Sequence, residues 1–123
     1  MPAVTFTQED LLERKQLQAG WRELRMKTVD EGPGKTDPTA LVWACLFVID
    51  GGNDDGVPVR HWFSEKAMGR IVDFVKCFIK GDMQAGRSYE LTDAVGQNVM
   101  GWVEYDIKQG FNTIKDWKKS QKV

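Results

Sequence analysis

The chain has few of the residues that enzymes and metalloproteins use for chemistry. It contains one histidine, His61, and two cysteines in 123 residues. Neither cysteine has a partner at a metal-ligand spacing, and no serine, cysteine or aspartate stands at a catalytic-motif spacing from the histidine. We therefore expect no catalytic residues, no metal site, no cofactor and no enzymatic activity. Cys45 and Cys77 are predicted to be reduced, packed thiols.

Long hydrophobic runs are also missing. No apolar stretch approaches the ~20 residues that cross a membrane. The N-terminal MPAVTFTQEDLL has no basic segment followed by an apolar core, so it does not resemble a signal peptide. These features predict a cytoplasmic protein without membrane contact, and the length suits one domain.

Two glycine-rich segments lack the spacing of known ligand loops. DGGNDDG (50–56) does not place oxygen ligands and a glycine in the register of an EF-hand calcium loop. GPGK (32–35) is too short for a phosphate-binding loop and leads into another turn. Both segments are interpreted as turns.

Charge is nearly balanced overall but is sorted along the sequence. The formal net charge of −1 argues against a protein that binds nucleic acid by charge alone. Residues 29–56 hold six acidic side chains against one lysine, whereas residues 107–123 hold five lysines against one aspartate. Sorted charge can build a basic groove on a protein of neutral overall charge.

Alternating and helical patterns predict the order β-β-β-α-β-β. This order is typical of a mainly β protein, a five-stranded barrel of the oligonucleotide/oligosaccharide-binding (OB) type with one capping helix. A half-open α+β sheet is the structural alternative. We expect an arm or short helix over 1–19, an OB-like domain over 20–119 and a polar basic tail over 120–123. The predicted strands are 20–29, 41–50, 57–63, 98–107 and 111–119, and the predicted helix is 64–81.

The second predicted strand, LVWACLFVID, is apolar on both faces. A strand half-buried in an antiparallel sheet normally alternates apolar with polar residues. Its aliphatic set, from Val42 to Val48, is predicted to face the barrel interior. Trp43 and Phe47 are then predicted to face outward, as a stacking platform or as the seam of a dimer.

Aromatic residues are the most informative feature. Five tryptophans are several times the usual proportion. Rings interleaved with cations suit single-stranded nucleic acid, because bases stack on rings and cations follow phosphates. The same face suits protein packing or dimerisation equally well, and composition leaves both interpretations open. The candidate nucleic-acid-binding residues are Arg25, Lys27, Trp43, Phe47, Arg60, Trp62, Trp102, Phe111 and Lys115, with Trp62 as the leading candidate.

Short motifs stand in order across residues 17–117: Gly20-Trp21, Asp50-Gly51, Trp62-Phe63, Val95-Gly96 and Asn112-Thr113-Ile114. In these motifs the chain is similar to a family of small phage single-stranded DNA-binding proteins of replication and recombination modules. The resemblance implies an OB-like fold, binding of single-stranded DNA in the host cytoplasm, and phage replication or recombination proteins as partners. Stacking on rings would make this binding independent of sequence. A homodimer through the apolar outer face is the other expected partner, and a non-catalytic protein-interaction module is the alternative function.

Overall fold

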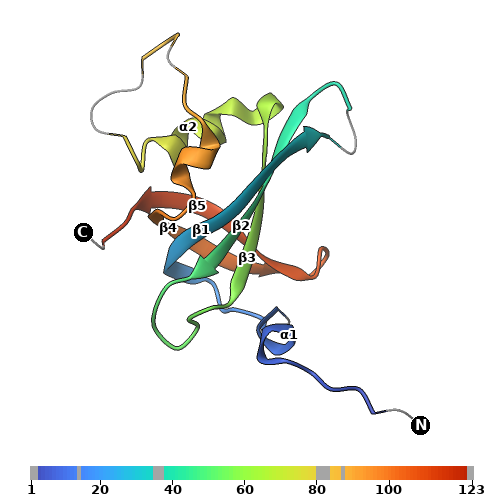
Figure 1. The fold of residues 1–123 in the computed structure, drawn as a ribbon. Helices are drawn as coiled ribbons and strands as arrows, with labels where there is room; N and C mark the ends of the chain where they lie inside the picture. Colours follow the sequence, from blue (N-terminus) through green and yellow to red (C-terminus); the bar gives the residue numbers. More distant parts are fainter. Residues whose placement is uncertain (1–2, 14, 35–37, 80–83, 87, 122–123) are drawn as a thin grey trace.

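The described residues form one curved antiparallel sheet with helices near its two ends (Figure 1). The structure is a computed structural model that describes residues 3–13, 15–34, 38–79, 84–86 and 88–121. Helix α2 lies near one end of the sheet and α1 near the other (Figure 1). The elements are α1 (Gln8–Glu13), β1 (Gly20–Pro33), β2 (Leu41–Ile49), β3 (Pro58–Ser64), the 3-10 turn η1 (Glu65–Ala67), α2 (Met68–Val75), the 3-10 turn η2 (Leu91–Ala94), β4 (Asn98–Asp106) and β5 (Phe111–Lys119).

Strand β1 organises the sheet, whose hydrogen-bonded order is β3-β2-β1-β4-β5. The first part of β1, from Gly20 to Arg25, pairs with β4, and the part from Leu24 onward pairs with β2. The β1–β2 register shifts between Met26 and Thr28, which marks a β-bulge. A bulge increases the local twist and bends the strand. One long bent strand therefore serves both halves of the sheet.

The predicted mainly β, OB-like fold with the order β-β-β-α-β-β is confirmed. Pro58 begins β3, which is an edge strand of the hydrogen-bonded sheet, as predicted. The helix is shorter than the predicted 64–81, since the α-helical segment runs from Met68 to Val75. Residues 80–81 of the predicted helix and 122–123 of the predicted tail lie outside the described residues.

A cluster of aromatic rings fills the core beneath α2. Phe74 from α2 lies 4.7 Å from Trp117 of β5 and 4.9 Å from Phe63 of β3, measured between ring centroids. Phe47 of β2 lies 5.4 Å from Trp117 and 5.9 Å from Phe74. Ring pairs at these separations add to the stability that burial itself provides. We call Phe47, Phe63, Phe74 and Trp117 the aromatic cluster.

The predicted facing of β2 is wrong. Phe47 is fully buried, and Trp43 packs against the core from a half-buried position, whereas Ala44 on the opposite face is half-exposed. Register explains the facing, because Phe47 lies opposite Met26 of β1 and Val59 of β3. Directly opposed residues point to the same side of a sheet. The aliphatic set Val42, Ala44, Leu46 and Val48 therefore faces outward.

Side chains, and not backbone bonds, join the two edge strands. In the part of the chain that the structure describes, no backbone hydrogen bond connects β3 with β5. Aromatic rings of β3 and β5 contact one another instead, and we call this contact the seam. The ring centroids of His61 and Phe63 on β3 lie 5.2 Å and 5.8 Å from that of Trp117 on β5. The sheet thus curls toward a barrel while its backbone ladder stays open.

His61 is a buried, neutral residue at this seam. Its exposed fraction is 7%, and its Nε2 atom has no hydrogen-bond partner among the described residues. Burial, together with the smaller effect of the nearby cations Arg70 and Lys115, lowers the pKa of His61 from 6.5 to about 4. A charged imidazole is therefore unfavourable inside the folded protein.

The corrected facing of β2 predicts a large difference between two adjacent residues. Phe47→Ala should lower the free energy of unfolding by about 3–5 kcal/mol, because it opens a cavity within the aromatic cluster. Leu46→Ala, on the half-exposed face of the same strand, should cost less than half as much. Urea denaturation of both variants measures the difference. Equal losses would contradict the facing described here.

The buried His61 predicts acid sensitivity. The unfolded chain binds the imidazole proton near pH 6.5, whereas the folded protein binds it only near pH 4. Stability from this residue is therefore fully present above pH 6.5 and is lost as the pH falls toward 4. Between pH 7 and pH 4.5 the loss should be about 2–3 kcal/mol.

The matched variant is His61→Phe, which keeps a ring among rings and cannot be protonated. Urea denaturation at both pH values should show a smaller loss for His61→Phe than for the wild type. Identical pH dependence in the two proteins would mean that the imidazole is not held neutral by the fold.

Candidate nucleic-acid interface

Strands β1, β2 and β3 present an outer face whose side chains are aligned in rows across the strands. Ala44 lies opposite Asp30 on one side and opposite Trp62 on the other. In the neighbouring row, Arg60 lies opposite Leu46. Because directly opposed residues share a face, Asp30, Ala44 and Trp62 form one row on the outside of the sheet.

This outer face contains an open groove of about 850 Å³, which we call the outer groove. Its floor is made of small or aliphatic side chains of β2 and the end of β1. One side carries the Asp30 carboxylate, and the other carries aromatic rings. The lining residues are Asp30, Glu31, Gly32, Pro33, Val42, Ala44, Trp62, Gln109 and Phe111.

Trp62 and Phe111 form an aromatic pair on the groove wall. Their ring centroids are 4.9 Å apart, and the rings are tilted by 51°. Trp62 is 45% exposed although its neighbours His61 and Phe63 are buried. This is the exposed large aromatic that the alternation of β3 predicts, and Phe111 reaches it from β5 across the seam.

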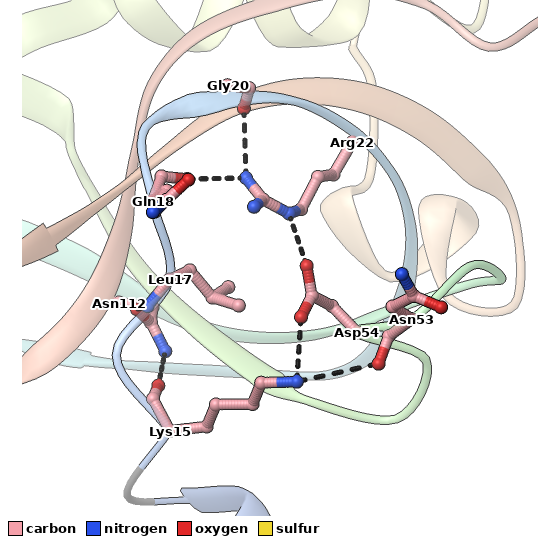
Figure 2. A network of polar contacts seen from close by, with 8 residues as sticks. All are labelled: Lys15, Leu17, Gln18, Gly20, Arg22, Asn53, Asp54 and Asn112. Carbon is pink, nitrogen blue, oxygen red and sulfur yellow. Dashed lines mark hydrogen bonds and ion pairs between the residues drawn. The ribbon is translucent and has the colours of Figure 1, made fainter.

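Asn112 fixes the direction of Phe111. The Asn112 side chain is 2% exposed, accepts a hydrogen bond from the Leu17 backbone N–H (3.0 Å) and donates one to the Lys15 carbonyl (2.7 Å). Figure 2 shows this amide reaching the segment before β1. Since successive residues of a strand alternate between faces, an inward Asn112 sends Phe111 outward. The Asn112 of the sequence motif therefore anchors the N-terminal segment.

An ion-pair network holds the same segment from its other side. Asp54, in the β2–β3 connection, binds Lys15 at 2.8 Å and Arg22 at 3.1 Å (Figure 2). The hydrogen bond from Lys15 is the largest cause of the lowered pKa of Asp54, and Arg22 lowers it as well. Arg22 also donates to the Gln18 carbonyl at 2.8 Å. The charges of Lys15 and Arg22 are therefore already paired within the protein and do not serve as ligand-binding groups.

The β4–β5 turn delivers Gln109 to the groove. The Asp106 side chain accepts hydrogen bonds from the backbone N–H groups of Lys108 (3.0 Å) and Gln109 (3.1 Å). Gly110 adopts a positive φ of 79°, which closes the turn next to Phe111. The tip of this turn is therefore held in one shape.

Of the predicted cations, Arg60 and Lys115 lie on the strands that carry the aromatic pair. Arg60 is exposed two residues before Trp62, and Lys115 is exposed and close enough to His61 to lower its pKa. Lys27 is exposed at the β1 bulge. Arg25 is bound to Asp50 at 3.2 Å, so part of its charge is already compensated.

Three predicted site residues lie elsewhere. Phe47 is in the core, and Trp43 shares its inward face, so neither can stack on an external ligand. Trp102 does face outward, but it belongs to β4 and packs edge-on against Trp21 at 5.7 Å. Its Nε1 donates to Glu104 at 2.9 Å. Trp102 is thus part of a separate outer surface on β1 and β4.

Sequence reasoning missed the acidic side of the groove. Asp30, Glu31 and Gln109 line it together with Ala44. The acidic character of this segment was visible in the charge distribution, but it led to no predicted site residue. No sequence signal aligned Asp30 with Trp62, because their alignment depends on two strand registers.

The described residues give no sign of a metal site or a membrane span. No group of three or more His, Cys, Asp or Glu among them could hold a metal ion. Cys45 and Cys77 are both free, and burial raises their thiol pKa values to about 12 and about 11. Among the same residues, no helix combines the length and the apolar character needed to cross a membrane.

Comparison with known proteins does not assign the chain to a family. No family model matches it, and no curated protein matches its sequence.

Proposed function

We propose that this protein binds single-stranded DNA in the outer groove, by stacking bases on Trp62 and Phe111. The observation that carries the proposal is the exposed ring pair, 4.9 Å apart, on the wall of a groove of about 850 Å³. Each stacked base contributes about 1–3 kcal/mol, and stacking tolerates any base. The protein would coat and protect single strands without performing chemistry and without a cofactor.

The position of the groove supports this proposal. In OB folds the face of strands 2 and 3, with the loops between strands 1 and 2 and between strands 4 and 5, is where oligonucleotides bind. The outer groove is lined by the same parts of this chain: the end of β1, the outer faces of β2 and β3, and the β4–β5 turn. This is an argument from fold analogy, and the exposed rings supply its chemistry.

Cations near the rings supply the second component of binding. Arg60 and Lys115 are exposed on β3 and β5, the strands that carry the aromatic pair, and can contact the phosphates of a strand stacked there. Each neutralised phosphate releases counterions, which makes affinity fall as salt rises. The resemblance to phage single-stranded DNA-binding proteins extends the proposal to a role in phage replication or recombination within the host cytoplasm.

A protein partner on the same face is the second candidate. The outward side chains of β2, which are Val42, Ala44, Leu46 and Val48, are apolar and half-exposed. Such a face also suits a second copy of the chain or a phage replication or recombination protein. Static light scattering of the free protein separates the homodimer from the monomer.

Binding to single strands should exceed binding to duplex. A labelled strand of about 30 nucleotides, titrated by fluorescence anisotropy at two salt concentrations, should bind more weakly at the higher salt. The matching duplex should bind much more weakly, because its bases are already stacked on one another. Arg60→Ala should reduce the slope of log affinity against log salt by about 0.7, the value for one phosphate of a single strand. Equal affinities for single strand and duplex would overturn the stacking proposal.

Two outward tryptophans test which surface binds. Trp62→Ala should weaken single-strand binding about five- to a hundred-fold through loss of a stacked base. Trp102→Ala, on the β1–β4 surface, should leave affinity per folded molecule within about two-fold, a change of under 0.5 kcal/mol. Thermal melting of both variants establishes the folded fraction. If Trp102→Ala loses affinity and Trp62→Ala does not, the outer groove is not the binding site.

A further inference from the structure

The outer groove has chemically different sides, and this difference bears on which bases it accepts. Asp30 is exposed at one side, and Trp62 and Phe111 form the other. Glu31 lines the same end of the groove, but its position opposite Trp43 places its side chain on the other face of the sheet. Within the residues that the structure describes, the Asp30 carboxylate makes no hydrogen bond or ion pair. It is therefore available to a ligand that enters the groove.

The row Asp30–Ala44–Trp62 sets the distance between ring and carboxylate. Adjacent strands are about 4.8 Å apart, so the backbones of Asp30 and Trp62 are separated by about 10 Å. Ala44 lies between them and has only a methyl group above the sheet. A base stacked on Trp62 can extend over Ala44 and present its edge to the Asp30 carboxylate.

Charge fixes the orientation of such a strand. The Asp30 carboxylate repels phosphates, so the sugar-phosphate chain is kept away from the end of β1. Arg60 and Lys115 are exposed on β3 and β5, the strands that carry the rings, and attract the chain toward them. The base edges, and not the phosphates, then point at Asp30.

We propose, on the basis of the proposed function, that Asp30 makes the groove prefer bases with an exocyclic amino group over thymine and uracil. An ionised carboxylate only accepts hydrogen bonds, and acidic side chains pair with the amino group of cytosine. Thymine and uracil present a carbonyl oxygen at the same ring position, which repels a carboxylate. Any base can therefore stack in the groove, but bases with an exocyclic amino group bind more tightly.

Homopolymer strands of dC and dU give the sharpest test, because at the C4 position one has an amino group and the other a carbonyl. A dT strand adds only the methyl group, and pH 7.5 keeps cytosine unprotonated. Wild-type protein, titrated by anisotropy at fixed salt, should bind dC about five-fold or more tightly than dU and dT. Asp30→Asn should bring the ratio close to one, because an amide offers both a donor and an acceptor.

Asp73→Asn is the matched control, since Asp73 is exposed on α2 outside the groove and its loss changes the net charge equally. It should shift the affinities for dC and dU together and leave their ratio unchanged. Affinity for dU or dT equal to that for dC would overturn this inference and leave single-strand binding intact. A preference for dC that survives Asp30→Asn would remove Asp30 as its cause. Absence of binding to every strand would overturn the proposed function, and this inference with it.

Discussion

The contact between Trp117 and the rings around it is the interaction on which the rest of the structure depends. Trp117 lies on β5, at the end of the hydrogen-bonded sheet, and β3 lies at the other end. Since no ladder joins these two strands among the described residues, their approach depends on side chains. Phe74 of α2 packs on Trp117 at 4.7 Å and on Phe63 of β3 at 4.9 Å. The Phe74 ring of α2 thus contacts both edge strands of the sheet.

The outer groove follows from the same closure. Strand alternation places Trp62 outside whenever His61 and Phe63 are inside. When the inner rings bring β3 against β5, the outer faces of those strands also meet, and Phe111 contacts Trp62. The inner ring contacts stabilise the fold, and the outer pair remains exposed for a ligand. The site is therefore built on rigid strands, with one wall contributed across the seam.

The distribution of charge matters more for the proposed site than its total. A net charge of −1 would suggest weak attraction for nucleic acid. Yet several cations are already used within the fold, such as Lys15 and Arg22 on Asp54. Arg60 and Lys115 lie on β3 and β5, the strands that carry the rings, whereas Asp30, which has no ion-pair partner among the described residues, lies on β1. This separation orients a bound strand and gives a neutral protein a means of discriminating between bases.

The sequence by itself determined the order of elements and the facing of the third strand, in which polar residues mark the outside. Alternation in VPVRHWF was enough to place Trp62 and Arg60 outward, as the structure has them. In LVWACLFVID nothing polar marks a face, so only the register with β1 and β3 decided that Phe47 is inside. The meeting of Trp62 with Phe111, and the row that aligns Asp30 with Trp62, were likewise decided by tertiary structure. Both join residues far apart in the chain, whose positions depend on a bulge, on two registers and on ring packing across an open seam.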